Sequence, residues 1–183
     1  MRKRKLIFVG GVHGVGKTTL CKEIESKFHV EHFSASNLIS REKQEEHLLN
    51  KRVEKIGENQ NILLTAINKY LKNENWYLLD GHFCLLNKDN EITKIPESTY
   101  DGICPNAILL LVDKPEDIYA RLSSRDSIKH DLALLKYFQE QEIGYAEYIS
   151  DKLNIPYLIY HLTESKNKVY TFIESLVTQA VSE

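Results

Sequence analysis

Residues 5–19 read KLIFVGGVHGVGKTT, and this stretch decides how the rest of the chain is interpreted. Its first part, residues 5–10, is a short apolar run of the kind that forms a buried β-strand. The part that follows, Gly11 to Thr18, matches the pattern G-x-x-x-x-G-K-[ST], and Leu20, Ile24 and Phe28 then recur at helical spacing. A strand, a glycine-rich turn and a helix in this order are the context that the pattern requires, so we predict a phosphate-binding loop (P-loop).

The chemistry of this loop follows from its glycines and its lysine. Glycines let successive backbone N–H groups curl around phosphate oxygens, and the following helix directs its partial positive charge at the same anion. We expect Lys17 to reach the β and γ phosphates of ATP and the Thr18 hydroxyl to bind Mg²⁺. The alternative interpretation is a glycine-rich turn with an incidental lysine.

The rest of the sequence alternates short apolar runs with amphipathic helical stretches. Further strands are expected at residues 30–34, 76–80, 107–112 and 156–160. Their continuous hydrophobicity is typical of strands that are buried on both faces of a parallel sheet. The sequence therefore predicts an α/β fold with three layers, α/β/α, in which helices cover both faces of the sheet.

Four other segments have interpretable patterns. Asp113-Lys114-Pro115-Glu116 predicts a helix start with Asp113 as the N-cap, and residues 83–96 predict a small hairpin or loop excursion. The polar segment 41–58 is expected to be a mobile helical cover outside the core. One apolar series at helical spacing is expected in the core: Leu135, Phe138, Tyr145 and Ile149.

Length and composition are those of one soluble globular domain. The chain has 183 residues, a formal charge of −2 and 42% hydrophobic residues, a balance that disfavours a protein coating duplex nucleic acid but allows a small anionic ligand. Its three cysteines form no C-x-x-C pair, which favours a reducing compartment, and we expect the protein to be cytoplasmic. The apolar runs are far shorter than the ~20 residues of a membrane span, so no membrane association is expected.

Two candidate site residues lie at the end of the strand expected at 76–80 and just after it. Asp80 ends that strand at the carboxyl edge of the sheet, where open α/β folds bind ligands, and we expect it to hold Mg²⁺ together with Thr18. A solvated strand end or an N-cap is the alternative for Asp80. His82 could donate or accept a hydrogen bond with an acceptor substrate, or merely close the turn. Four histidines show no ligand spacing and are assigned no role: His29, His32, His47 and His161.

Three arginines are candidates for binding phosphate groups. Arg121 and Arg125 are four residues apart, so they share one helix face and could neutralise charge that develops on a transferred phosphoryl group. A solvated helix face is the alternative for that pair. Arg41 in the polar cover could bind a second phosphate, or serve solubility alone.

With these motifs, the chain resembles the P-loop nucleoside monophosphate kinases, and most specifically the archaeal-type adenylate kinases. The matching pieces are Gly11-Val12, Gly14 to Thr19, Leu78 to His82, Ile95-Pro96, Asn106 to Val112, Pro115-Glu116, Ile118 to Arg121 and Arg125-Asp126. The resemblance spans roughly residues 5–160. It lacks the arginine that this group commonly carries shortly after the third strand, because residues 81–86 read GHFCLL.

The resemblance implies a five-stranded parallel sheet in one P-loop kinase domain spanning residues 1–183. An acceptor-side helical cover would occupy about residues 35–60, and a lid about residues 121–131, with Arg121 and Arg125 on the lid side. Ser36 to Arg41 would border the acceptor, so Ser36, Arg41 and His82 are the expected substrate contacts. ATP would be bound by Gly11, Val12, His13, Gly14, Val15, Gly16, Lys17, Thr18 and Thr19.

The resulting hypothesis is a kinase that uses ATP and Mg²⁺ to phosphorylate a nucleoside monophosphate, with AMP as the expected acceptor, and Lys17, Arg121 and Arg125 as catalytic residues. Segments 41–58 and 125–130 are expected to close over the substrates. The missing arginine motivates one alternative, an ATPase switch that acts on a protein or RNA partner. The other alternative is a kinase of another small acceptor or a polynucleotide end. A nucleic-acid partner is disfavoured by the charge, and the oligomeric state is not predicted.

Overall fold

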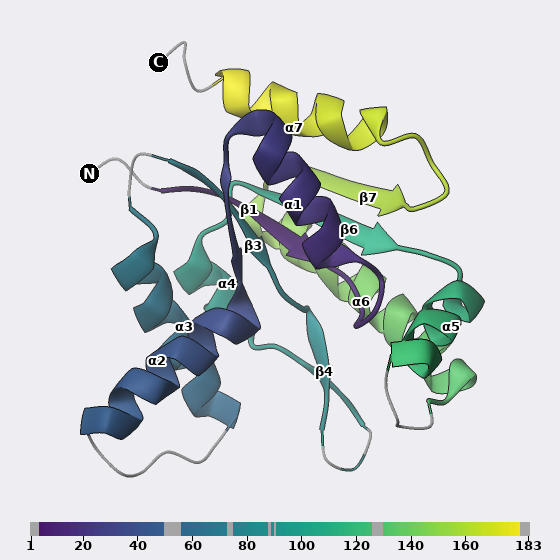
Figure 1. Ribbon diagram of the computed structural model, residues 1–183, viewed down its shortest axis with the longest axis horizontal. Coiled ribbons are helices and arrows are strands. Elements are labelled where there is room, and N and C mark those ends of the chain that lie inside the picture. The colour runs from purple at the N-terminus through teal and green to yellow at the C-terminus, as the bar shows by residue number, and fades with distance from the viewer. Residues whose placement is uncertain are drawn as a thin grey trace.

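A five-stranded parallel sheet forms the centre of the computed structural model, which describes residues 4–49, 56–72, 75–87, 89, 91–125 and 130–179 (Figure 1). The strand order is β2-β3-β1-β6-β7. The strands are β1 (Lys5–Gly10), β2 (Glu31–Ser34), β3 (Trp76–Asp80), β6 (Ala107–Val112) and β7 (Tyr157–His161). The predicted fold class is confirmed, and each strand lies within one residue of its predicted position.

Helices cover both faces of the sheet. On one face lie α1 (Lys17–Phe28) and α7 (Asn167–Gln179), which meet where the rings of Phe28 and Tyr170 pack 5.9 Å apart. The other face is covered by the long helix α6 (Leu132–Leu153) and by α4 (Glu97–Ile103), which also contacts α3 (Ile56–Tyr70). Helix α2 (Ala35–Leu49) packs on α3, and α5 (Pro115–Arg125) packs on α6.

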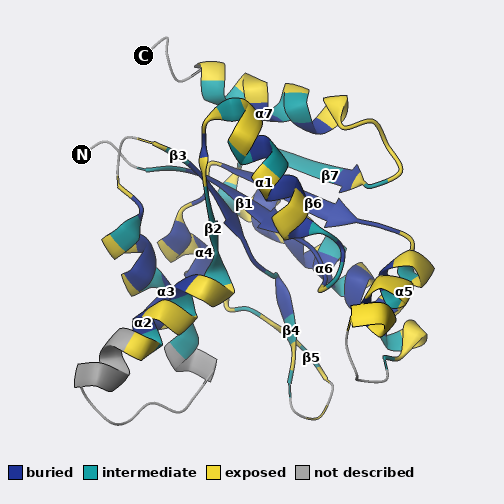
Figure 2. Ribbon diagram, in the orientation of Figure 1, coloured by how far each residue is buried: buried dark blue, intermediate teal, exposed yellow. Residues whose placement is uncertain are grey.

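The hydrophobic core lies between these layers. All six residues of β6 are buried, as continuous hydrophobicity predicts for a strand covered on both faces (Figure 2). The apolar series predicted on α6 is also buried at Leu135, Phe138, Tyr145 and Ile149. In the parallel register, Asp80 is the partner of Val9 on β1 and of Ser34 on β2. The end of β3 therefore lies beside both the glycine-rich loop and the start of α2.

The predicted excursion after β3 is an antiparallel hairpin, in which β4 (Cys84–Leu86) pairs with β5 (Ile92–Lys94). The predicted polar cover is partly helical, with α2 and α3 on either side of residues 50–55, which lie outside the described residues. Residues 126–129 of the predicted lid also lie outside them. No helix in the described part of the chain is long and apolar enough to cross a membrane.

Helix α5 begins without the predicted N-cap, and helix α4 is followed by a residue in the left-handed conformation. The prediction of Asp113 as an N-cap is wrong, because α5 begins at Pro115 and the Asp113 carboxylate instead accepts a hydrogen bond of 2.7 Å from Arg121 Nη2. Helix α4 is followed by Cys104, an exposed residue in the left-handed conformation (φ 54°) whose N–H donates to the Tyr100 carbonyl.

Candidate functional site

The loop between β1 and α1 has the backbone of a phosphate-binding loop. Its glycines at positions 11, 14 and 16 adopt positive φ angles. At Gly11, where φ is +138°, a Cβ atom would also lie 2.6 Å from the Leu111 carbonyl oxygen. Only glycine fits this position, because any side chain meets both a strained backbone and the neighbouring strand.

Lys17 bridges the loop. Its Nζ donates hydrogen bonds to the carbonyl oxygens of Gly11 (2.7 Å) and Val12 (3.1 Å), and the side chain is buried. Burial lowers the pKa of Lys17 to about 8, while the nearby carboxylates of Glu142 and Asp80 partly oppose that shift. The ammonium is therefore held at the loop, close to the position that phosphate oxygens would take.

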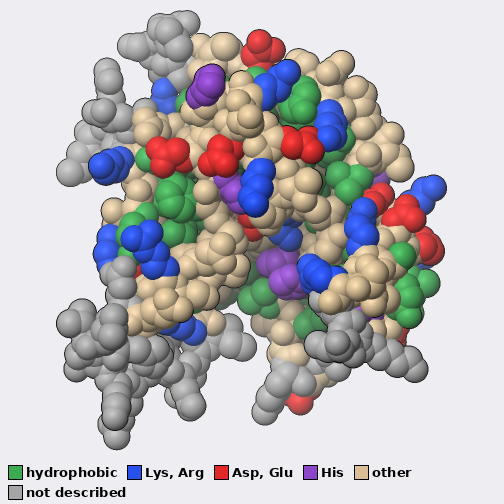
Figure 3. All heavy atoms as spheres, in the orientation of Figure 1, with side chains coloured by type: hydrophobic (Ala, Val, Ile, Leu, Met, Phe, Trp, Pro, Cys, Tyr) green, Lys and Arg blue, Asp and Glu red, His purple; other side chains and the backbone are tan. Residues whose placement is uncertain are grey.

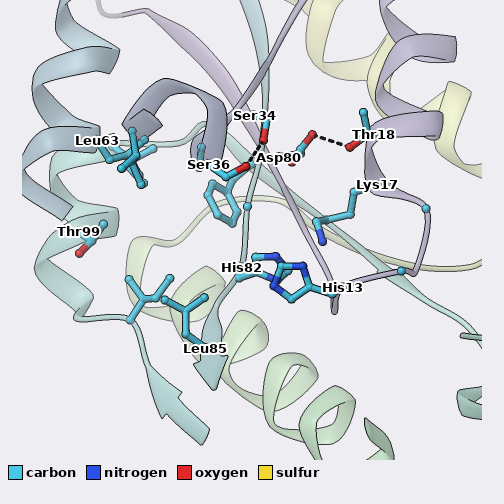
Figure 4. Close-up of a pocket in the computed structure, with 18 of the residues that line it drawn as sticks. His13, Lys17, Thr18, Ser34, Ser36, Leu63, Asp80, His82, Leu85 and Thr99 are labelled. Atoms are coloured by element: carbon cyan, nitrogen blue, oxygen red, sulfur yellow. Dashed lines mark hydrogen bonds between the residues drawn. The ribbon is translucent and has the colours of Figure 1, made fainter. Parts of the chain in front are cut away.

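Thr18 and Asp80 form an oxygen pair at the mouth of the loop. The Thr18 hydroxyl donates to Asp80 Oδ2 at 3.3 Å, so one cation could contact both side chains after a small rearrangement (Figure 4). A carboxylate and a hydroxyl are hard oxygen donors of the type that Mg²⁺ prefers, with waters completing its shell. The residues present therefore fit the predicted Mg²⁺ site.

A second contact to Asp80 was not predicted. His32 Nε2 lies 2.6 Å from Asp80 Oδ2, and both side chains are less than a tenth exposed. The register explains the contact: Ser34 is the partner of Asp80, so His32, two residues earlier on β2, projects from the same face of the sheet. Finding it from the sequence requires knowing that β2 and β3 are neighbours.

Glu142 of α6 is the second residue that the sequence analysis missed. Its carboxylate is buried beneath the loop and accepts hydrogen bonds from the N–H groups of Gly11 (3.2 Å), Phe83 (2.9 Å) and Cys84 (2.7 Å). Burial raises the pKa of Glu142 to about 7, although these N–H donors and Lys17 oppose the shift. The sequence signal that could have indicated Glu142 is its position between Phe138 and Tyr145, where an acidic residue interrupts an apolar helical series.

Two histidines stand together where the loop faces the β3–β4 connection. The rings of His13 and His82 lie 4.0 Å apart between centroids, and His82 Nδ1 is buried 3.9 Å from Glu142 Oε1 (Figure 4). Burial, followed by the charge of Lys17, holds the pKa of His82 well below its usual range. His82 is therefore a neutral imidazole that can accept or donate one hydrogen bond.

Several of these groups line one cavity of about 560 Å³, namely His13, Lys17, Thr18, Asp80 and His82, whereas His32 and Glu142 do not. In the space-filling view, histidine and basic side chains gather around the hollow in the middle of the face shown (Figure 3). The end near the loop is polar and includes Lys17, Thr18, Asp80 and both predicted arginines. The opposite end, between α2, α3, α4 and the hairpin, is mostly apolar and is lined by Phe8, Ile39, Leu63, Leu85, Ile95, Tyr100 and Ile103.

Most of the predicted site residues line this cavity. They are His13, Gly14, Gly16, Lys17, Thr18, Thr19, Ser36, Asp80, His82, Arg121 and Arg125. Gly11, Val12 and Val15 belong to the loop but are buried and are not part of the lining. Arg41 does not line the cavity, because its guanidinium lies 4.1 Å above the ring of Tyr70.

The comparisons with known proteins agree with this architecture. A family model described as an AAA domain (AAA_17) matches residues 10–133. No curated protein sequence matches the chain. Among solved structures, the fold is similar to a gluconokinase from Sinorhizobium meliloti 1021, with 10% identity, a TM-score of 0.54 and coverage of 98% of this chain and 94% of that one.

Two further solved structures have the same fold. One is an uncharacterized protein from Eubacterium ventriosum ATCC 27560, with 11% identity, a TM-score of 0.54 and coverage of 96% of this chain and 99% of that one. The other is a candidate kinase from Chloroflexus aurantiacus J-10-fl, with 14% identity, a TM-score of 0.52 and coverage of 98% of both chains. At these identities the likeness establishes the fold, which is that of P-loop kinases.

Proposed function

Because the chain belongs to the AAA domain family and has the fold of P-loop kinases, we propose that it is an ATP-dependent kinase of a small acceptor, built as one domain over residues 1–183. One observation carries the proposal. The phosphate-binding loop lines one end of the cavity and mostly apolar side chains line the other, so a nucleotide and an acceptor could be held side by side.

The residues around the loop would supply positioning and charge. The Lys17 ammonium would exchange its two carbonyl partners for phosphate oxygens, and Arg121 and Arg125 would stabilise the charge that develops on the transferred group. Thr18 and Asp80 would hold Mg²⁺, which neutralises charge on the β and γ phosphates when it is bound. His82, as a neutral imidazole, would hydrogen-bond the acceptor group.

For the acceptor, the resemblance to adenylate kinases supports a nucleoside monophosphate, with AMP first. The cavity could hold a base against its apolar wall, with Ser36 at its edge. A lid formed by about residues 121–131, which include Arg121 and Arg125, and a cover formed by about residues 35–60 would then close over the substrates. Closure would exclude water and so favour phosphate transfer over hydrolysis.

A second acceptor class is favoured by the position of Arg41. That arginine stacks on Tyr70, and among the described residues the apolar end of the cavity is lined by no lysine or arginine. A phosphate monoester at that end would lose its water without gaining a charged partner there. An uncharged acceptor with a hydroxyl group, such as a nucleoside, is therefore the alternative.

The test is transfer of label from γ-labelled ATP, with Mg²⁺, to a panel of AMP, CMP, UMP, GMP and dTMP and the corresponding nucleosides. A labelled diphosphate supports the monophosphate kinase, and a labelled monophosphate supports the alternative acceptor. Label that appears only as free phosphate, at one rate with every acceptor, would contradict a kinase and favour an ATPase switch.

The matched variants are Lys17→Ala and Lys22→Ala, because both lysines lie on α1 and Lys22 is exposed to solvent. Loss of the Lys17 charge should lower the transfer rate by at least roughly 100-fold, in line with other groups that stabilise transition-state charge. Lys22→Ala should keep the rate of the natural protein. Normal turnover in Lys17→Ala would exclude the proposed mechanism.

A further inference from the structure

Three potential metal ligands lie close together around Asp80, the residue that also hydrogen-bonds Thr18. They are Cys21 on α1, His32 on β2 and Asp80 on β3, and one ligand atom from each lies within 4.8 Å of the other two. Cys21 is fully buried, and the side chains of His32 and Asp80 are 9% and 8% exposed. Among the residues that the structure describes, no other group of three such side chains comes together in this way.

The chemistry of this group differs from that of the Mg²⁺ site. A thiolate, an imidazole and a carboxylate are ligands of Zn²⁺ and similar borderline ions, and three protein ligands leave a fourth position for water. Mg²⁺ selects oxygen ligands and is a poor match for sulfur. Asp80 belongs to both sets, with Thr18 on one side and Cys21 and His32 on the other.

We propose that Cys21, His32 and Asp80 form a binding site for Zn²⁺ or a chemically similar divalent ion, adjoining the P-loop. An ion would reach it from the cavity, because Asp80 lines that cavity. Binding replaces the thiol proton of Cys21, which is released to solvent, while His32 binds as a neutral imidazole through Nε2.

Only small movements are needed to form the site. With Zn–S near 2.3 Å and Zn–N and Zn–O near 2.0 Å, neighbouring ligand atoms in a tetrahedral site lie about 3.3 to 3.6 Å apart. His32 Nε2 and Asp80 Oδ2, now 2.6 Å apart, must separate by under ~1 Å to admit the ion between them. The other two separations, from Cys21 Sγ to His32 and to Asp80, are at most 4.8 Å. They must shorten by at most about 1.3 Å to reach the spacing of a tetrahedral site.

Occupancy of this site has a consequence for catalysis that rests on the proposed function. Because Asp80 would be engaged by the second ion, it would be withdrawn from the Mg²⁺ site. Zn²⁺ should therefore inhibit phosphate transfer by the natural protein and inhibit Cys21→Ala much less. The binding site itself does not depend on that activity and is tested separately.

The direct test is a titration of metal-free, full-length protein with Co²⁺ under anaerobic, reducing conditions. Co²⁺ bound to a thiolate in a tetrahedral site gives a sulfur-to-cobalt charge-transfer band in the near ultraviolet and intense visible bands. We expect these bands to saturate at one Co²⁺ per chain and to disappear when Zn²⁺ displaces it. Absence of the sulfur band would overturn the proposal.

Cysteine variants identify the ligand. Cys21→Ala should lose the charge-transfer band, whereas Cys84→Ala, which removes another buried thiol, and Cys104→Ala, which removes the exposed one, should keep it. A band that persists in Cys21→Ala, or one that requires Cys104, would overturn the site.

His32→Gln provides a second measurement if Cys21→Ala does not fold. This variant keeps the sulfur but removes the imidazole, so Zn²⁺ affinity, measured by displacement of Co²⁺, should weaken by roughly tenfold or more. An unchanged affinity would exclude His32 as a ligand. If the natural protein shows the cobalt bands but transfers no phosphate, the metal site is supported and the proposed function is contradicted.

Discussion

Glu142 couples the stability of the protein to pH through one buried carboxylate. Its pKa is raised from 4.5 to about 7 by burial, so between these values the folded state holds a proton that the unfolded state has released. Stability therefore falls as the pH rises from about 4.5 to about 7 and levels off above that range. The total change is on the order of 3 kcal/mol.

Denaturant unfolding of the natural protein and Glu142→Gln at pH 5 and pH 8 checks this prediction. The stability of the natural protein relative to the variant should be roughly 2 to 3 kcal/mol greater at pH 5 than at pH 8, because most of the change falls between these two values. Glu140→Gln, an exposed position on the same helix, serves as the control and should show little pH-dependent difference. A difference between the natural protein and Glu142→Gln that does not change with pH would contradict the assignment.

At the scale of elements, the loop before α1 depends on glycine, whereas a glycine in α6 is dispensable. Gly11→Ala should prevent the loop from forming and cost several kcal/mol, because a Cβ would lie 2.6 Å from the Leu111 carbonyl oxygen at a φ of +138°. Gly144→Ala should instead stabilise the protein by about 0.5 to 1 kcal/mol, since it is helical and has no atom within 4 Å of its Cβ position.

Thermal unfolding of the two alanine variants measures this contrast. The same substitution is expected to act in opposite directions, so a general effect of replacing glycine is separated from the geometry of the loop. Equal destabilisation in both variants would show that the steric argument at Gly11 is incorrect.

The elements that the sequence predicts well are those fixed by local patterns. Strands such as Ala107–Val112 are continuous apolar runs, and the start of α1 follows from the spacing of glycines and Lys17. The cap at Asp113 was mispredicted because Arg121, eight residues on, binds its carboxylate instead. A local cap pattern does not include this competing partner.

Contacts between distant segments could not be predicted in the same way. His32 reaches Asp80 because β2 and β3 are neighbours, and Glu142 reaches Gly11 because α6 crosses beneath the loop. Arg41 was expected at the acceptor, but the ring of Tyr70, on the neighbouring helix α3, offers its guanidinium a packing surface. Each outcome depends on how elements are placed in three dimensions.

For the whole molecule, binding of nucleotide should stabilise the fold as one cooperative unit. At a free concentration 100 times its Kd, a non-hydrolysable ATP analogue with Mg²⁺ adds about 2.7 kcal/mol. In a domain of this size that corresponds to a rise in Tm of roughly 5 to 10 °C. A single calorimetric transition should move by this amount, since the loop follows β1 and Asp80 ends β3, two strands of the same five-stranded sheet.

The comparison between the two lysine variants gives this measurement its control. Lys17→Ala should show little rise in Tm at the same analogue concentration, whereas Lys22→Ala should match the natural protein. Two separate transitions, of which the analogue moves one, would show that the chain does not unfold as a single domain.

Cys104 gives the protein a practical property. It is the exposed thiol among three cysteines whose other two members are buried, and it follows α4, whose Tyr100 and Ile103 line the cavity wall. A maleimide dye should therefore attach selectively to Cys104 of the natural protein, next to the apolar end of the cavity. Binding of an acceptor in the apolar end of the cavity could then be followed by fluorescence in real time, without introducing a cysteine for labelling.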